Sequence, residues 1–208
     1  MKFYLSSYKF GNETKKLRGL IPRNNKKVAF IANALDYSND LERRKKSEEE
    51  NINGLKKLGF VPKTLDLRDY FGKKAKLEKE FKKYGSVFVR GGNAFVLRQA
   101  MRLSGLDEIL KKLANSKKDF LYAGYSAGAC VLTPSLKGLD LADDITQKPY
   151  KEQHQIIWSG LGLLGYLIVP HYKSDHKESK AINKVVEYCI ENKILFKALR
   201  DGDTIIIK

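Results

Sequence analysis

Short apolar runs, each long enough for one buried strand, alternate along this chain with segments of helical pattern. Val28 to Ala32 contains no polar side chain, which is typical of a strand covered on both faces of a parallel sheet. Further strands are predicted at 1–6, 60–67, 86–89, 120–123, 166–169 and 204–207, and helices at 38–59, 73–84, 94–103, 107–114 and 179–192. Because strands joined through helices pair in parallel, the sequence predicts one α/β domain over residues 1–208 with a mostly parallel sheet.

The composition fits a folded domain without a membrane span. The chain has 208 residues, of which 42% are hydrophobic, and no apolar stretch approaches the ~20 residues that cross a bilayer. The first residues lack the long apolar core and cleavage site of a signal peptide. Cys130 and Cys189 are too few for a disulfide framework or a cysteine-rich zinc site. We therefore expect a cytoplasmic protein with no membrane partner.

The positive charge is large but dispersed. Lys and Arg number 40 against 24 Asp and Glu, which gives a formal charge of +16. The basic residues form many short runs and alternate with acids on helical faces, so that Arg44 can meet Glu48 one turn later. No zinc finger or aromatic RNA-binding motif accompanies them. We interpret the excess as a solvated surface and expect no nucleic-acid partner.

The most informative motif is the segment from Gly124 to Ala129, which reads Gly-Tyr-Ser-Ala-Gly-Ala. It follows a predicted strand and precedes a helix, as a G-x-S-x-G nucleophile elbow does. The sharp turn would project the Ser126 hydroxyl from the sheet, and the start of the helix would offer N–H groups to a developing oxyanion. The context therefore indicates a nucleophilic serine.

Two other strand ends carry chemical groups. Gly91 and Gly92 follow the strand at 86–89 and allow a close backbone approach that could complete an oxyanion hole. Of the three histidines, His154 lies in a polar stretch and His176 at a predicted helix start, whereas His171 follows an apolar strand. We expect His171 to be the base that accepts the serine proton.

A third residue must orient the histidine, and spacing alone does not select it. The candidates are Asp140, Asp143, Asp144, Asp175 and Asp201.

With these motifs in order, the sequence resembles the S51 serine peptidases, the group of aspartyl dipeptidase (dipeptidase E) and the more distant cyanophycinases. Four segments carry the resemblance: Val28 to Asp36, Arg90 to Phe95, Gly124 to Thr133 and Val169 to Tyr172. The resemblance spans nearly the whole chain. It implies a three-layer, flavodoxin-like fold similar to that of class I glutamine amidotransferases, with serine in the position that usually holds cysteine.

The resemblance also implies roles for individual residues. Ser126 matches the family nucleophile and His171 the general base, while Gly92 and Ala127 match positions whose N–H groups would hold the oxyanion. Where relatives have a Ser-His-Glu triad, the acid precedes a late strand, and Asp201 aligns there with a side chain shorter by one methylene.

The same resemblance suggests a second candidate aspartate. An aspartate between nucleophile and histidine is considered essential in the family, and Asp140 is the nearest match. We expect Asp201 to orient His171, with Asp140 as the alternative acid or as a support or substrate-site residue.

The implied activity is hydrolysis of small peptides, as a dipeptidase for N-terminal aspartate, through an acyl-enzyme on Ser126. Such a substrate needs a cation near its carboxylate, and Arg90, Lys173 and Arg200 lie close to the motifs without the sequence choosing among them.

Two alternatives remain open. An α/β-hydrolase esterase would place its acid before the histidine, which Asp140 or Asp143 satisfies, but no HGGG-type loop is present. A catalytically silent interaction protein would rely on the basic surface. No paired histidines, paired cysteines, P-loop or G-x-G-x-x-G motif occurs, so we expect no metal and no cofactor. A homo-oligomer is left open.

Overall fold

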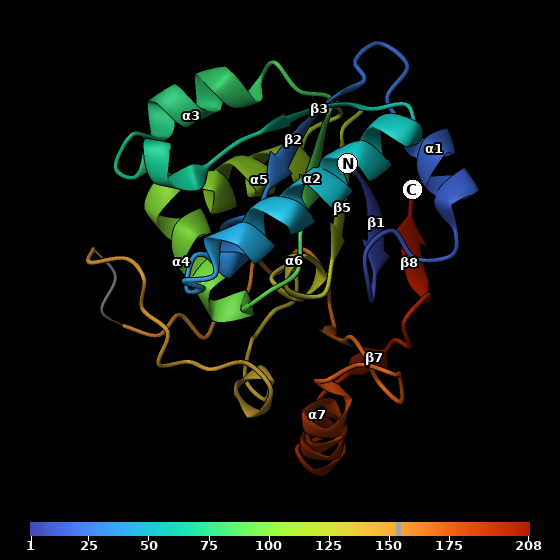
Figure 1. The fold of residues 1–208 in the computed structure, drawn as a ribbon, viewed down its shortest axis with the longest axis vertical. Helices are drawn as coiled ribbons and strands as arrows, with labels where there is room; N and C mark the ends of the chain where they lie inside the picture. The colour runs from blue at the N-terminus through green and yellow to red at the C-terminus, as the bar shows by residue number, and fades with distance from the viewer. Residues whose placement is uncertain (153–154) are drawn as a thin grey trace.

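The structure, a computed structural model, describes residues 1–152 and 155–208. At its centre lies a six-stranded sheet with the strand order β3-β2-β4-β5-β1-β8 (Figure 1). Its strands are β1 (Lys2–Ser6), β2 (Lys27–Ile31), β3 (Val61–Thr64), β4 (Ser86–Val89), β5 (Leu121–Tyr125) and β8 (Thr204–Ile207). All neighbours pair in parallel except β8, which runs antiparallel to β1 at one edge. The mostly parallel sheet predicted from the sequence is therefore confirmed.

Helices cover both faces of this sheet. They are α1 (Thr14–Leu20), α2 (Leu41–Lys57), α3 (Lys74–Phe81), α4 (Ala94–Ser104), α5 (Leu106–Ala114), α6 (Ala127–Cys130) and α7 (Ser179–Glu191). On one face, α1 and α2 bury Leu17 and Leu55 against strand residues such as Phe30. On the other face, α3 to α6 close a larger core that includes Ile31 and Phe95. The inner strands β1, β2, β4 and β5 are buried on both sides, which explains their largely apolar sequences.

A second, two-stranded sheet lies beside the main one. The strand expected at 166–169 forms as β6 (Leu167–Val169), but it pairs in parallel with β7 (Phe196–Ala198), outside the main sheet. Figure 1 shows this pair and α7 at the end of the molecule away from β3. The sequence pattern does not predict β7, because its three residues are partly or fully exposed and carry no apolar run.

Two other elements differ from the sequence expectations. The segment 60–67 forms only the four-residue β3, after which Leu67–Tyr70 turn into a short 3-10 helix. β3 is an edge strand whose residues are largely exposed, which is where Pro62 is tolerated. The short helix α1 was not predicted, because only Leu17 and Leu20 of its residues are buried.

The strand register brings the carboxyl ends of three central strands to one edge of the sheet. Ser6 at the end of β1 pairs with Tyr125 of β5, and Val89 of β4 pairs with Gly124. The residues that follow these strands therefore start from neighbouring positions, where sites form in parallel α/β sheets.

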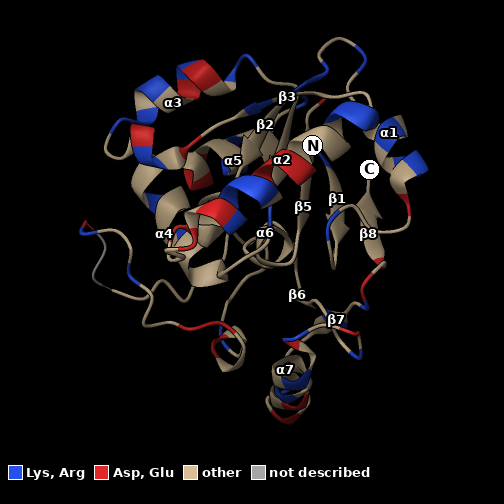
Figure 2. Cartoon of the chain, viewed as in Figure 1, with Lys and Arg blue, Asp and Glu red and all other residues tan. Residues whose placement is uncertain are grey.

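The charged residues are spread over the whole molecule. Figure 2 shows Lys and Arg on every long helix, mixed with Asp and Glu on α2, α3 and α7. Within residues 1–152 and 155–208, no helix is both long and apolar enough to cross a bilayer.

Candidate active site

Ser126 lies in the tight turn between β5 and α6, with φ 48° and ψ −120°. Residues other than glycine seldom adopt a positive φ, and such strain is concentrated at functional positions. The flanking glycines permit the turn, because a Cβ on Gly128 would lie 2.2 Å from the Val89 carbonyl oxygen and one on Gly124 3.0 Å from that of Gly128. The strand, turn and helix of a nucleophile elbow are thus all present.

His171 follows β6 and is buried, with 2% of its surface exposed. Its ring Nδ1 lies 2.7 Å from Oδ1 of Asp201, in the turn that leads into β8. This contact directs an Nδ1–H to the carboxylate and leaves the lone pair on Nε2, the form that a general base requires.

Ser7, which the motifs in the sequence did not indicate, connects these two residues. Ser7, directly after β1, donates its hydroxyl to Asp201 Oδ1 at 2.8 Å and accepts the backbone N–H of His171 at 2.8 Å. The Asp201 N–H in turn donates to Ser174 Oγ at 2.8 Å. Ser7 follows a strand end just as Arg90 and Ser126 do, so the rule that pointed to those positions could also have found it.

The surroundings of His171 favour its neutral form. Burial lowers the pKa of the imidazole below its ordinary value and the neighbouring His176 lowers it further, while Asp201 and Glu178 oppose this shift. The two imidazoles are stacked, with ring centroids 3.8 Å apart and planes 9° apart. The Tyr8 ring meets both edge-on, at 6.1 Å from His171 and 5.7 Å from His176.

The Gly91–Gly92 connection approaches Ser126 closely. A Cβ on Gly91 would lie 2.8 Å from Cβ of Ser126, and Gly92 has φ 144°, with Ala34 as its nearest neighbour. In the described residues, no backbone hydrogen bond is made by the N–H of Gly92 or of Ala127. Both groups therefore remain available to an external acceptor.

The other candidate acids lie elsewhere. Asp140 is exposed and accepts the N–H of Gly138 at 2.8 Å. Asp143 accepts the N–H of Ala94 at the start of α4, and desolvation raises its pKa to about 7. Asp144 bonds Thr146, and Asp175 is exposed. The acid beside His171 is thus Asp201, which follows the histidine in the chain, whereas an α/β-hydrolase has its acid before it.

A pocket of about 310 Å³ lies beside the candidate catalytic residues. Ser126, His171, Gly91 and Gly92 all line it, although no hydrogen bond links Ser126 Oγ to His171 among the described side chains. Such catalytic hydrogen bonds are often formed only when substrate binds. His154, the third histidine, lies outside the described residues.

The pocket wall is mainly cationic. It contains two carboxylates, Glu50 and Glu178, against six basic side chains: Lys9, Arg43, Arg44, Lys46, Arg90 and Lys177. Lys9 pairs with Glu50, and Arg44 with the buried Asp36. Of the three cations that the sequence placed near the motifs, Arg90 lines the pocket, whereas Lys173 and Arg200 do not. The basic residues of α2 were missed, because the chain brings them to the site only through the fold.

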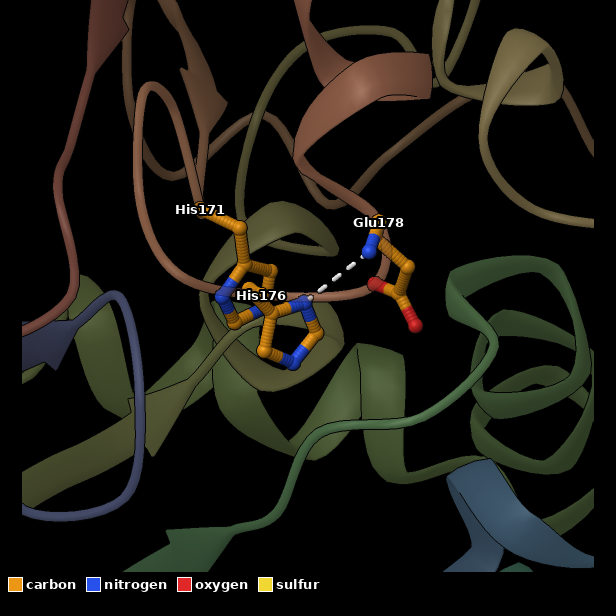
Figure 3. Close-up of side chains that lie close together, drawn as sticks. All are labelled: His171, His176 and Glu178. Atoms are coloured by element: carbon orange, nitrogen blue, oxygen red, sulfur yellow. Dashed lines mark hydrogen bonds between the residues drawn. The ribbon is translucent and has the colours of Figure 1, made fainter.

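His171, His176 and Glu178 have ligand atoms within 4.8 Å of one another, a spacing that a metal site would use (Figure 3). A metal ion, however, must lie near the plane of each imidazole at about 2.0–2.1 Å from its nitrogen. Two stacked rings have parallel planes, so they cannot both direct a lone pair at one ion in this arrangement. The cluster of His171, His176 and Glu178 therefore has donor atoms that suit a cation, but its stacked rings do not have the geometry to chelate a metal ion.

The sequence matches a known protein family and several known proteins. A family model described as peptidase family S51 matches residues 5–208. An uncharacterized peptidase of Listeria monocytogenes is 28% identical over 148 residues, which cover 70% of this chain and 67% of the relative. Peptidase E of Streptomyces coelicolor is 34% identical over 122 residues, covering 56% of this chain and 46% of that protein. The matches span about two thirds or less of these relatives' own length.

Solved structures share the fold. A crystal structure from Listeria monocytogenes, assigned to peptidase E, superposes with a TM-score of 0.77 at 23% identity, covering 99% of this chain and 93% of the other. A peptidase from an acI-B1 Actinobacterium superposes with a TM-score of 0.69 at 16% identity, covering 100% and 83%. The flavodoxin-like architecture is therefore confirmed. Because the family match also extends over nearly the entire sequence, the resemblance found in the motifs is confirmed too, and the chain belongs to peptidase family S51, a family of serine peptidases.

Proposed function

We propose that this serine peptidase hydrolyses small peptides, dipeptides in particular, that begin with aspartate, with Ser126 as nucleophile, His171 as base and Asp201 as the orienting acid. The observation that carries the proposal is the meeting of three features in one pocket. These are the strained turn at Ser126, the His171 ring with Asp201 2.7 Å from its Nδ1, and the Gly91–Gly92 connection, in which the Gly92 N–H makes no backbone hydrogen bond within the described part of the chain.

The proposed reaction follows the order of an acyl-enzyme mechanism. His171 Nε2 takes the proton of the Ser126 hydroxyl as Oγ attacks the scissile carbonyl carbon. The resulting imidazolium is stabilised by Asp201, whose carboxylate accepts the Ser7 hydroxyl and whose backbone N–H donates to Ser174 Oγ. His171 then gives the proton to the leaving amine, and water, activated by the same base, hydrolyses the ester on Ser126.

The oxyanion of each tetrahedral intermediate would lie between the N–H groups of Gly92 and Ala127. Preorganised donors of this kind contribute about 3–4 kcal/mol each to transition-state stabilisation. The dipole at the start of α6 adds to the same effect, although that helix has only four residues.

The cationic pocket supports an acidic substrate. Arg90 precedes the two glycines and is the basic residue nearest to them in the chain, and it takes part in no ion pair among the described residues. We assign the side-chain carboxylate of the N-terminal aspartate to this guanidinium, which can bind a carboxylate with two parallel hydrogen bonds. Several relatives are named peptidases, one of them peptidase E.

The test is release of free amino acid from Asp-Leu and from a panel of X-Leu dipeptides. We expect Asp-Leu to be the best substrate and Ser126→Ala to abolish its cleavage. Arg90→Gln should lower kcat/KM for Asp-Leu by about 10–100-fold and leave a slow neutral dipeptide nearly unaffected. Arg200→Gln is the matched control, since Arg200 lies outside the pocket.

Labelling by a fluorophosphonate separates chemistry from specificity. If Ser126 is labelled but no dipeptide is cleaved, the nucleophile assignment stands and the substrate assignment is wrong. If Arg90→Gln lowers kcat/KM equally for all dipeptides, the guanidinium does not bind the aspartate side chain selectively.

A further inference from the structure

Glu178 is a carboxylate in the pocket to which the reaction above gives no role. It occupies the residue before α7, where an acidic side chain commonly accepts N–H groups of the first helical turn. Here its side chain makes no such cap. Instead its backbone N–H donates to Nδ1 of His176 at 3.3 Å (Figure 3). Its oxygens are thus not used by the helix that it begins.

The two pocket carboxylates differ in what surrounds them. Glu50 lies 3.3 Å from the Lys9 ammonium. Glu178 takes part in no ion pair among residues 1–152 and 155–208, and it is only partly exposed. A carboxylate without an ion-pair partner, in a pocket whose charged side chains are mostly basic, indicates a place for a positive group of the substrate.

The distance to the base identifies that group. In an N-terminal residue the α-nitrogen lies about 2.5 Å from the carbonyl carbon, as the bond lengths and the angle at Cα require. In a reactive complex that carbon is about 3 Å from the serine Oγ, which is itself about 3 Å from the histidine nitrogen. A free α-ammonium group must therefore lie within several ångströms of His171. The Glu178 and His171 ligand atoms lie within 4.8 Å of each other, which leaves room for a charge-assisted hydrogen bond.

We propose that Glu178 binds the α-ammonium group of the substrate's N-terminal residue, so that the enzyme requires a free amino terminus. This assignment rests on the proposed function. An ammonium group suits the cluster of His171, His176 and Glu178 better than a metal ion does, because it needs only an acceptor oxygen and imposes no requirement on the stacked ring planes. Arg90 and Glu178 would then bind the two charged groups of aspartate from the same pocket.

The experiment compares Asp-Leu with succinyl-Leu, which is the same molecule without the α-amino group. Wild type should prefer Asp-Leu by about 10–100-fold in kcat/KM, the range expected for a charged hydrogen bond. Glu178→Gln should bring this ratio close to one, because only Asp-Leu loses a charged hydrogen bond. Any effect of Glu178 on the basicity of His171 changes both substrates alike and cancels in the ratio. Glu50→Gln, at the other pocket carboxylate, should leave the ratio unchanged.

Other results would contradict either the assignment of Glu178 or the proposed function. A wild type that cleaves Asp-Leu and succinyl-Leu equally, or a Glu178→Gln variant that keeps the full preference, overturns the assignment of Glu178 while the proposed function stands. A ratio that collapses in Glu50→Gln moves the ammonium site to Glu50. A wild type that cleaves neither compound overturns the proposed function, and the assignment with it.

Discussion

The Ser7 hydroxyl accepts the backbone N–H of His171 at 2.8 Å, although the two residues are 164 positions apart in the chain. Through the same Oγ it donates to the carboxylate oxygen that faces the histidine ring. Ser7 thereby fixes both the backbone and the acid of the proposed base, and it does so from the end of a strand in the main sheet.

Ser7→Ala should therefore reduce activity as well as stability. We expect kcat/KM to fall by about 10–100-fold, as for other residues that orient a functional imidazole. The free energy of unfolding should fall by about 1–2 kcal/mol, because the buried His171 N–H loses its acceptor. Ser6→Ala is the control, since Ser6 is equally buried but its hydroxyl donates to the Lys9 carbonyl. Equal losses of kcat/KM in both variants would contradict a specific role for Ser7.

Asp201→Asn and Asp140→Asn should separate the two candidate acids. Asparagine at 201 cannot stabilise the imidazolium, so kcat should fall by about 10³–10⁴-fold with little change in KM. Asp140 is exposed and bonds only its own turn, so Asp140→Asn should stay within a few-fold of wild type. Steady-state kinetics on Asp-Leu decide the matter, and a larger loss in Asp140→Asn would reverse the assignment.

The dependence of kcat/KM on pH should show the effect of His176 on the pKa of His171, the ring on which it stacks. Because the base acts when neutral, kcat/KM rises with pH as His171 loses its proton. Its pKa lies below the ordinary 6.5, partly through His176, so activity should extend to lower pH than an isolated imidazole allows. His176→Gln removes this contribution, and the acidic limb should then move to higher pH. His176→Phe, which keeps a stacked ring, should shift it in the same direction. An unmoved limb in both variants would show that His176 does not act on the base.

Gly92→Ala should disable the oxyanion hole. With φ 144° and a Cβ position 2.4 Å from the Ala34 carbonyl oxygen, the connection must move to accept a methyl group. The displaced N–H should cost about 100-fold or more in kcat. Gly19→Ala is the control, because Gly19 lies in α1 with no atom within 4 Å of the added carbon. That variant should keep full activity and melt slightly higher, and full activity in Gly92→Ala as well would contradict the role of Gly92.

The sequence predicted the main sheet because its inner strands are buried on both faces and are largely apolar. Val28 to Ala32 is the clearest example, and the structure has β2 over Lys27–Ile31. The small sheet was harder, since β7 covers three partly exposed residues and exists only because β6 lies beside it. A strand of that kind depends on tertiary pairing and leaves no periodic pattern in the sequence.

In the candidate site, too, some residues could be predicted from the sequence and others could not. Ser126, His171 and the glycines follow strands and could be predicted one by one from those positions. The partner of His171 could not be chosen among five aspartates, since spacing along the chain does not report distance across a turn. Glu178 and the basic residues of α2 were missed for a similar reason. Nothing in a charged helix such as Leu41–Lys57 indicates that one side of it faces a serine more than 60 residues later.

The proposed nucleophile and base stand on different sheets. Ser126 follows β5 of the main sheet, whereas His171 follows β6, which is paired only with β7. Units of this size can open locally without global unfolding. If β6, β7 and α7 detach together, the serine keeps its strained turn but loses its proton acceptor. Heat or mild denaturant should then abolish turnover while the six-stranded sheet is still paired, so that activity measures how firmly the unit of β6, β7 and α7 packs against that sheet.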